Sequence, residues 1–149
     1  GKYQYPEKFI PVIIKGCIER KPIPVYGDGY NIRDWIHVND HVEAIFKLTK
    51  KNTKNGFYLI GSNCEINNIN LAYKICGLYD KLYKTKNSKK LIKMTTDRKN
   101  HDFRYAIDNS YIKKYINWKP KIKLKTGLIE TIKFYKQNHT KLKKIFPYS

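Results

Sequence analysis

Apolar residues recur at helical spacing over much of this chain. The segment 9–19, FIPVIIKGCIE, is an apolar run of helix length that stops before KPIP, where the prolines prevent its continuation. In segment 38–51 the apolar residues fall on one helical face, and Asn39 or Asp40 can cap the first turn. We therefore predict a helix over each of these segments.

Similar patterns return further along the chain. The periodic segment 69–82, INLAYKICGLYDKL, follows Asn68, which is a good N-cap residue. DNSYIKKYI predicts a short helix with Asp108 as its N-cap, and Asn117 can take the left-handed conformation that ends it. TGLIETIKFYKQ, at 126–137, predicts the last helix.

Runs of high β propensity lie between these helical patterns. IPVYGDGYNIRDWIHV, at 23–38, has such runs on both sides of Gly27-Asp28-Gly29, which predicts a hairpin or a tight strand connection. FYLIG at 57–61 predicts a buried strand, and LIKMTT at 91–96 predicts a short one. Alternation of helices and strands without internal repeats predicts an α/β fold.

The composition supports one folded unit over residues 1–149. Apolar residues make up 41% and aromatic residues 14% of the chain, which is enough to fill a core. No apolar run has the length of a membrane span, and the N-terminal GKYQYPEKFIP lacks the order of a signal peptide. The three cysteines are never spaced as CxxC, so neither a disulfide framework nor a zinc site is indicated. A reducing, cytoplasmic location fits these features best.

The formal net charge of +19 raises the question of a polyanionic partner. Lysine supplies most of the 31 basic residues, and Asn, Ile and Tyr, which share A/T-rich codons with lysine, are abundant too. The lysines are scattered, with a modest cluster from Lys81 to Lys93, whereas a nucleic-acid binder concentrates charge on one element. We therefore expect no nucleic-acid and no membrane partner. A non-catalytic basic binding module remains the alternative.

Arginine is rare in this chain and therefore informative. Its planar guanidinium can bind phosphate or carboxylate bidentately, which the ammonium group of lysine cannot do. The segment DRKNHDFRYAID, at 97–108, combines arginines with a histidine and aspartates and marks a candidate site. Arg20 is interpreted as the exposed end of the first helix, with a surface ion pair at most. The arginines are Arg20, Arg33, Arg98 and Arg104.

Ion pairing with a neighbouring carboxylate is the alternative for the other arginines. Arg33 can pair with Asp34 or Asp28, which stand close to it in the sequence. Asp102 and Arg104 can equally form a local ion pair. Such pairs at a protein surface contribute little to stability.

Two motifs that suggest catalysis are rejected. GDGYNI, at 27–32, half matches a dinucleotide-binding loop, but it lacks the third glycine and a β-rich run follows where a helix is required. Tyr115 and Lys119 have the Tyr-x-x-x-Lys spacing of short-chain dehydrogenases, but Asn117 and Pro120 interrupt the helix that both side chains would need.

Several segments nevertheless occur in an order that resembles a known enzyme family. They are YQYPEKFIP, KPIPVYGDGYNIRDWIHVNDHVEAI, YLIG, DRKNHDFRYAID and NWKP, and the likeness runs from Tyr3 to about Gln137. PVYGDG followed by RDWIHV is typical of sugar-nucleotide epimerases and dehydratases, while the cluster before RYAID is more particular. The chain thus resembles the dTDP-glucose 4,6-dehydratases, which are extended short-chain dehydrogenases.

The resemblance implies a domain organisation. Residues 1–149 would be the C-terminal, sugar-nucleotide-binding lobe of a Rossmann-type α/β enzyme, with elements that pack on an NAD-binding domain. The family's glycine-rich NAD loop, its Tyr and Lys, and its Asp-Glu acid/base pair have no counterpart in this sequence. We therefore expect the NAD domain and the catalytic residues to lie in an N-terminal half that this chain lacks, and we expect no metal.

The resemblance also implies an activity for the complete protein. dTDP-glucose would be converted to dTDP-4-keto-6-deoxyglucose: the C4 hydroxyl is oxidised with NAD, water leaves across C5 and C6, and hydride returns to C6. The complete enzyme would be a homodimer, and the present chain alone would be inactive. A fragment of another NDP-sugar epimerase or dehydratase is the alternative.

Substrate contacts carry over residue by residue from the resemblance. Arg33 and Arg98 would contact the diphosphate, His101 would line the same pocket, and Asn68 would contact the nucleotide. Segment 21–26 would hold the thymine, where an ordinary edge strand is the alternative. A Glu-Lys pair would lie near the sugar and the nucleotide. The alternative is that these two residues only start a helix. The residues of these last two groups are Lys21, Pro22, Pro24, Val25, Tyr26, Glu7 and Lys8.

One departure from the family lies within the candidate site. Where the family has Arg-Pro-Gly-His, this chain has Arg98-Lys99-Asn100-His101 and so loses the preset turn of Pro-Gly. Asn100 can adopt the left-handed conformation that the glycine would take. We therefore expect the loop to keep its shape.

Overall fold

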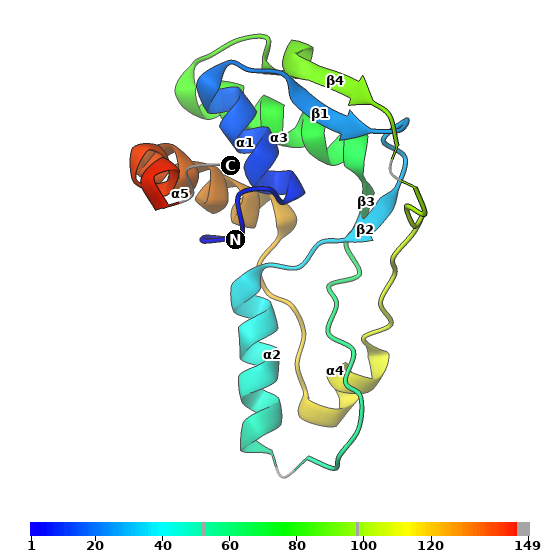
Figure 1. Ribbon diagram of the computed structural model, residues 1–149. Coiled ribbons are helices and arrows are strands. Elements are labelled where there is room, and N and C mark those ends of the chain that lie inside the picture. The colour runs from blue at the N-terminus through cyan, green and yellow to red at the C-terminus, as the bar shows by residue number, and fades with distance from the viewer. Residues whose placement is uncertain (52, 98, 146–149) are drawn as a thin grey trace.

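The computed structural model describes residues 1–51, 53–97 and 99–145. In Figure 1, α1 and α3 lie beside the β1–β4 pair, α5 lies beside α1 on the side away from these strands, and α2 and α4 form an extension below. This arrangement confirms the predicted α/β fold class. The elements are α1 (Phe9–Glu19), β1 (Ile23–Tyr26), β2 (Ile32–Asp34), α2 (Val38–Lys50), β3 (Glu65–Asn67), α3 (Asn68–Tyr83), the 3-10 helix η1 (Ser88–Leu91), β4 (Ile92–Thr95), α4 (Ser110–Ile116) and α5 (Leu124–Ile145).

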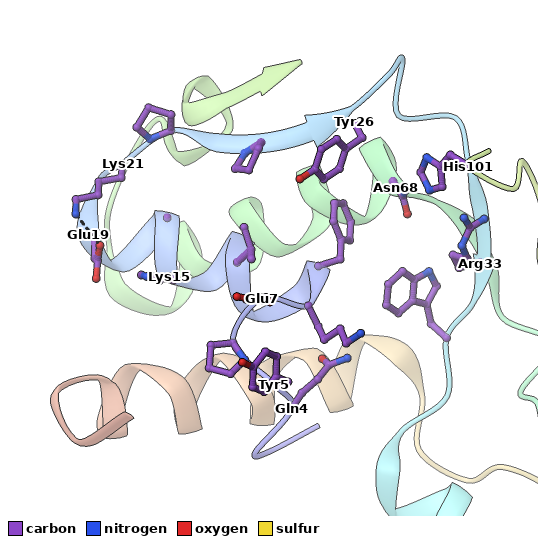
Figure 2. Close-up of a pocket in the computed structure, with 18 of the residues that line it drawn as sticks. Gln4, Tyr5, Glu7, Lys15, Glu19, Lys21, Tyr26, Arg33, Asn68 and His101 are labelled. Carbon is purple, nitrogen blue, oxygen red and sulfur yellow. Dashed lines mark ion pairs between the residues drawn. The ribbon is translucent and has the colours of Figure 1, made fainter. Parts of the chain in front are cut away.

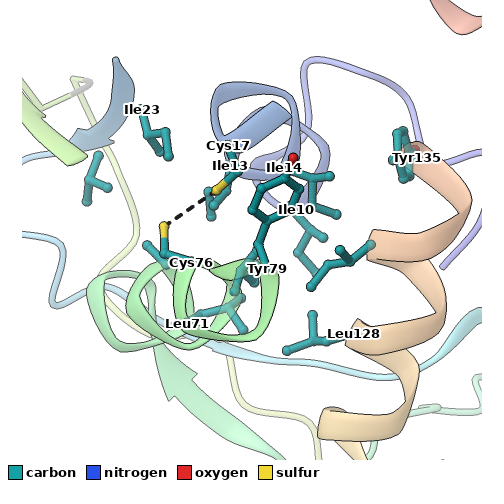
Figure 3. Close-up of a cluster of buried hydrophobic side chains, with 14 of the residues drawn as sticks. Ile10, Ile13, Ile14, Cys17, Ile23, Leu71, Cys76, Tyr79, Leu128 and Tyr135 are labelled. Atoms are coloured by element: carbon teal, nitrogen blue, oxygen red, sulfur yellow. Dashed lines mark hydrogen bonds between the residues drawn. The ribbon is translucent and has the colours of Figure 1, made fainter. Parts of the chain in front are cut away.

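The main core lies between α1, α3 and α5 (Figure 3). On α1 the buried side chains recur at i, i+3, i+4 and i+7, which places them on one helical face. Each isoleucine among them stabilises the fold by about 1.5–3 kcal/mol when fully buried. They are Ile10, Ile13, Ile14 and Cys17. The Sγ atoms of Cys17 and Cys76 lie 3.8 Å apart where α1 meets α3, and the cysteines are free thiols.

The strands form separate pairs. β1 runs parallel to β4 with Ile23 opposite Ile92, and β2 runs antiparallel to β3 with Ile32 opposite Asn67. The predicted hairpin between β1 and β2 is therefore wrong, because each of these strands pairs with a distant segment. The alternative, a tight connection, is confirmed by the positive φ of Gly27 and Gly29.

A second cluster of buried residues holds the extension together. Ala44 of α2 packs with residues from α4 and with Trp118, and these side chains are almost fully buried. The opposite face of α2 is open, since Val42 is 55% and Phe46 59% exposed. The predicted strand at 57–61 is wrong: these residues pair with no other strand, and Phe57 is 99% exposed. A strand needs a neighbour for its N–H and C=O groups, and the described residues supply none here.

The predicted N-caps of α2 and α3 are each off by at least one residue. His37 caps α2, where its Nδ1 accepts a hydrogen bond from the Asn39 N–H. Asn67 caps α3, and its side chain accepts from the Asn70 N–H. Asn68 is instead the first residue of the helix and is buried.

The ends of α4 match the prediction in part. Asn109, not Asp108, occupies the N-cap position, although the Asp108 carboxylate accepts a hydrogen bond from the Ser110 N–H. Asn117 has the predicted left-handed conformation, with a φ of 48°. α5 begins before and ends beyond its predicted bounds. In the described part of the chain, no helix has the length and apolarity needed to cross a membrane.

Asp40 anchors the segment that precedes α5. Its side chain is 2% exposed and accepts hydrogen bonds from the N–H groups of Lys121 (3.1 Å) and Ile122 (2.9 Å). The carboxylate therefore holds a distant loop. It does not cap α2, so the cap predicted at Asp40 is wrong. Removing it leaves two partly buried N–H donors without an acceptor.

We predict that Asp40→Ala lowers the free energy of unfolding by about 1–3 kcal/mol, because two backbone donors lose their partner. Asn39→Ala, at the adjacent exposed position, should change it by less than about 0.5 kcal/mol. Urea denaturation followed by circular dichroism measures both. Equal stability of the two variants would show that Asp40 is not an anchor.

Candidate functional site

A cavity of about 1060 Å³ lies between α1, β1 and β2 (Figure 2). Segments far apart in the sequence line it: the residues before α1, one face of α1, the start of β1, β2, the N-terminus of α3, and the loop after β4. Among the residues assigned to substrate by resemblance, the structure brings together Glu7, Lys8, Lys21, Pro22, Pro24, Tyr26, Arg33, Asn68 and His101. Arg98 lies outside the described residues.

The wall formed by β1 follows the alternation of a strand. Ile23 and Val25 point into the core and are 0% exposed, whereas Pro24 and Tyr26 line the cavity. The side chain of Val25 therefore points away from the cavity. The resemblance assigns the thymine contacts of this segment to backbone groups, so the assignment of Val25 stays a prediction.

Arg33 is fixed at one end of the cavity. Its Nη1 donates to the carbonyl of Ile32 at 2.7 Å and its Nη2 to that of Asp102 at 2.8 Å. The guanidinium also lies over the Tyr105 ring, 4.8 Å from the centroid. The sequence alternative of an ion pair with Asp34 or Asp28 is wrong, because carbonyls hold this arginine in place.

Asp34 has a different task. Its carboxylate accepts from the N–H groups of Ser62 (2.8 Å) and Cys64 (2.8 Å) and from the Ser62 hydroxyl (2.7 Å). Burial raises the pKa of Asp34, but these hydrogen bonds outweigh burial and hold it below the ordinary value. Asp34 thus stays charged and fastens the loop after residue 61 beside the cavity.

His101 and Asn68 lie beside Arg33 (Figure 2). The Nδ1 atom of His101 is 2.7 Å from the Asp97 Oδ1 atom, and the His101 side chain is 8% exposed. Asn100 has a φ of 56°, so the left-handed conformation expected for this loop is confirmed. The loop therefore turns where the family has glycine.

The opposite end of the cavity contains a buried carboxylate. The Glu19 side chain is 7% exposed and forms ion pairs with Lys143 (2.7 Å), His139 (3.2 Å) and Lys21 (3.2 Å). Burial raises the pKa of Glu19, but the bonds from Lys143 and Lys21 prevail and lower it to about 2. Glu19 thus ties α1 to the last turns of α5 and to the start of β1.

Sequence reasoning missed the face of α1 that lines the cavity. It consists of Val12, Lys15, Gly16 and Glu19, again at i, i+3, i+4 and i+7. The sequence offered this spacing as a second stripe beside the apolar one, with the charged residues Lys15 and Glu19 in it. Trp35, which also lines the cavity, carried no comparable signal.

Arg104 and Arg20 do not line the cavity. Arg104 binds the carboxylate of Glu65 through Nε (2.7 Å) and Nη2 (2.9 Å), so the predicted Asp102–Arg104 pair is wrong. Arg20 donates to the Ser88 hydroxyl and to the Lys86 carbonyl, each at 3.1 Å, and links α1 to η1. It is thus more than an exposed helix end.

The described residues show no site for a metal or a dinucleotide. They contain no group of His, Cys, Asp or Glu arranged to hold a metal ion. GDGYNI leads into β2 and not into a helix, and α4 ends at Ile116, before Lys119. The rejection of GDGYNI as a dinucleotide loop and the rejection of Tyr115 and Lys119 as a catalytic pair are thus confirmed.

The family follows from comparison with known proteins. The family model described as GDP-mannose 4,6 dehydratase matches residues 1–131. The chain belongs to this family. A curated relative, the dTDP-glucose 4,6-dehydratase of Escherichia coli, is 41% identical over 143 residues, which are 93% of this chain and 40% of the relative. The chain spans about two fifths of the length of the curated relatives it matches first.

Solved structures of this group have the same fold. dTDP-glucose 4,6-dehydratase from Bacillus anthracis, in complex with NAD, aligns with a TM-score of 0.82 at 39% identity, covering 94% of this chain and 42% of that one. The Streptomyces venezuelae enzyme, solved with NAD and a second ligand, gives 0.83 at 30% identity with the same coverage. The likeness to dTDP-glucose 4,6-dehydratases within the family is thereby confirmed.

The ion pairs of Glu19 predict a pH dependence of stability. The folded-state pKa is about 2 against an ordinary 4.5, so the stabilisation is complete above pH 4.5 and is lost as the pH falls towards 2. Because Lys21 and Lys143 are half exposed or more, we expect about 2 kcal/mol after allowing for solvent screening.

Urea titrations at intervals from pH 6 to pH 2 test this dependence. Glu19→Gln should be less stable at pH 6 and should lose less stability on acidification than the parent chain. Glu7→Gln, at an exposed carboxylate of the same cavity, is the control and should follow the parent. Parallel curves for the parent and Glu19→Gln would contradict the assignment.

Proposed function

We propose that the cavity binds dTDP-glucose, as the substrate-binding portion of an NAD-dependent dTDP-glucose 4,6-dehydratase. The observation that carries the proposal is the fixed guanidinium of Arg33 beside His101 and Asn68 at one end of a 1060 Å³ cavity. A guanidinium and an imidazolium are suitable donors for a diphosphate. The prolines of β1 and the ring of Tyr26 supply an apolar wall for a base.

The reaction itself is proposed to depend on groups outside these 149 residues. Loss of water from C5 and C6 requires oxidation at C4, for which NAD supplies the hydride acceptor. The described residues offer no glycine-rich loop leading into a helix, so NAD would be held by another part of the complete protein. The role of the present chain is to grip the nucleotide and thereby position the sugar.

The open face of α2 supports the same organisation. Val42, Ile45 and Phe46 on α2 and Phe57 in the segment without a strand partner are all more than 40% exposed. Large exposed apolar groups gathered on one element mark a surface that another unit covers. We infer that the remainder of the complete protein covers it. The expected homodimer and the cytoplasmic location stay predictions.

Nucleotide specificity distinguishes the alternative enzymes. The family model carries the description of a GDP-mannose enzyme, whereas the curated relatives act on dTDP-glucose. Competition between dTDP, UDP and GDP for the cavity therefore separates a dTDP-glucose dehydratase from a relative that uses another sugar nucleotide.

We predict that Arg33→Lys weakens dTDP binding about tenfold or more, because lysine keeps the charge but loses both the fork and its carbonyl anchors. Arg98→Lys should act in the same direction. Arg104→Lys is the matched control, since Arg104 binds Glu65 and does not line the cavity. Isothermal titration calorimetry at one salt concentration compares the variants. Equal weakening by all of them would mean that the arginines act only as diffuse charge.

We also predict that the 149-residue chain alone neither binds NAD tightly nor forms product from dTDP-glucose, because its sequence has no glycine-rich NAD loop. Addition of the NAD-binding portion of a dTDP-glucose 4,6-dehydratase as a separate chain should restore product formation. Turnover by the purified chain, free of other dehydratase, would refute this division of labour.

A further inference from the structure

The turn Gly27-Asp28-Gly29 needs an explanation, since it leads into a strand and binds no dinucleotide. The Gly27 N–H donates to the Thr95 carbonyl at 2.9 Å, which ties the turn to the end of β4. Gly27 has a φ of +59°, and a Cβ atom added to it would lie 2.9 Å from Oδ2 and 3.0 Å from Cγ of Asp97. The Asp97 carboxylate therefore rests on backbone that only glycine leaves bare.

Asp97 in turn holds the imidazole of His101. A carboxylate is only an acceptor, so the 2.7 Å contact between Oδ1 and Nδ1 places a proton on Nδ1. In a neutral ring this leaves Nε2 as an acceptor, and in a charged ring Nε2 also donates. Any hydrogen bond from the ring to a ligand thus runs through Nε2.

The two residues occupy different sides of the loop. The His101 side chain is 8% exposed and lines the cavity next to Arg33 and Asn68, whereas the Asp97 side chain is 43% exposed and does not line it (Figure 2). A carboxylate behind an imidazole that faces a site is the arrangement that fixes ring orientation and tautomer. An ordinary surface ion pair does not require a glycine in contact with its carboxylate, as Asp97 has at Gly27.

We propose that Asp97, seated on Gly27, is the positioning residue that holds His101 in its Nδ1–H form with Nε2 directed to the diphosphate of the ligand. The inference rests on the proposed function for its ligand and on the described contacts alone for its geometry. When the diphosphate binds, a charged ring donates from Nε2 to a phosphate oxygen. The GDG turn thereby acts on the site indirectly, by supporting Asp97, and does not contact the ligand itself.

The geometric part is tested without ligand. Long-range ¹H–¹⁵N correlation spectra distinguish the Nδ1–H from the Nε2–H form of a neutral histidine, and a His101→Gln sample assigns the signal. We expect the Nδ1–H form in the parent chain and its loss in Asp97→Ala and Gly27→Ala. Asp97→Asn, which keeps an acceptor oxygen, should retain it in part. The Nε2–H form in the parent chain would overturn the proposal.

Gly56→Ala is the matched control for Gly27→Ala, since an added Cβ at Gly56 meets nothing within 4 Å. Its histidine spectrum should equal that of the parent chain. Circular dichroism of each variant establishes that it is folded. If Gly27→Ala unfolds the chain, Asp97→Ala and Asp97→Asn alone decide the matter.

The ligand part is tested by calorimetry with dTDP. We expect Asp97→Ala to weaken binding about tenfold, as the loss of one hydrogen bond to a charged group would, and we expect dTDP to shift the Nε2 signal of His101 in the parent spectrum. If Asp97→Ala binds like the parent while Arg33→Lys is weak, the positioning role is refuted and the proposed function stands. If the parent itself does not bind dTDP, the proposed function fails. The ligand-free spectra alone then decide whether Asp97 holds His101 in its Nδ1–H form.

Discussion

The close approach of α1 to β1 is the constraint on which the cavity depends. A Cβ atom at Gly16 would lie 2.4 Å from Cγ1 of Ile23, so any other residue there would push the helix away from the strand. With glycine, one face of α1 reaches the core through Ile13 and Ile14. The neighbouring face is left to line the cavity, and the apolar packing of the first face fixes the polar wall formed by the second.

Carboxylates anchor several segments that lie outside regular structure. Asp34 holds the loop after residue 61, and Asp40 holds the segment before α5. Asp80 accepts from the Thr85 hydroxyl (2.8 Å) and the Ser88 N–H (3.1 Å), which shapes the connection from α3 to η1. Buried N–H groups of loops need acceptors, and an ionised carboxylate provides several at once. These segments are thus held by side chains where no ladder of backbone bonds exists.

Local patterns in the sequence account for the helices and fail where partners are distant. The spacing of Ile10, Ile13 and Ile14 predicts α1 because a helix closes its bonds within itself. FYLI has the composition of a strand, but pairing needs a second segment, which composition cannot supply. For the same reason β1 pairs with β4 and not with the nearer β2. The N-caps were predicted at the wrong residues because neighbours such as Asn67 and Asn68 are equally suited to capping. The backbone conformation selects one of them.

Residues of the candidate site were predictable from the sequence where they lie in motifs that resemble those of a known family. Arg33 and His101 stand in segments that resemble a family, whereas the face of α1 required only attention to a second stripe at the same spacing. The environment of Glu19 was not predictable, since Lys143 and His139 reach it from the far end of the chain. Side-chain partners across such separations depend on the packing of α5 against α1.

Net charge, by contrast, says little about this site. The excess of lysine is spread over the sequence, and Lys21 and Lys143 are partly balanced by Glu19. What distinguishes the cavity is the restraint placed on its donors: carbonyls and an aromatic ring hold Arg33, and Asp97 holds His101. A restrained donor loses less conformational entropy when it meets an anion than a flexible lysine does. Under the proposed function, selectivity for a diphosphate in a chain of charge +19 therefore comes from fixed geometry, because lysines are spread along the whole sequence.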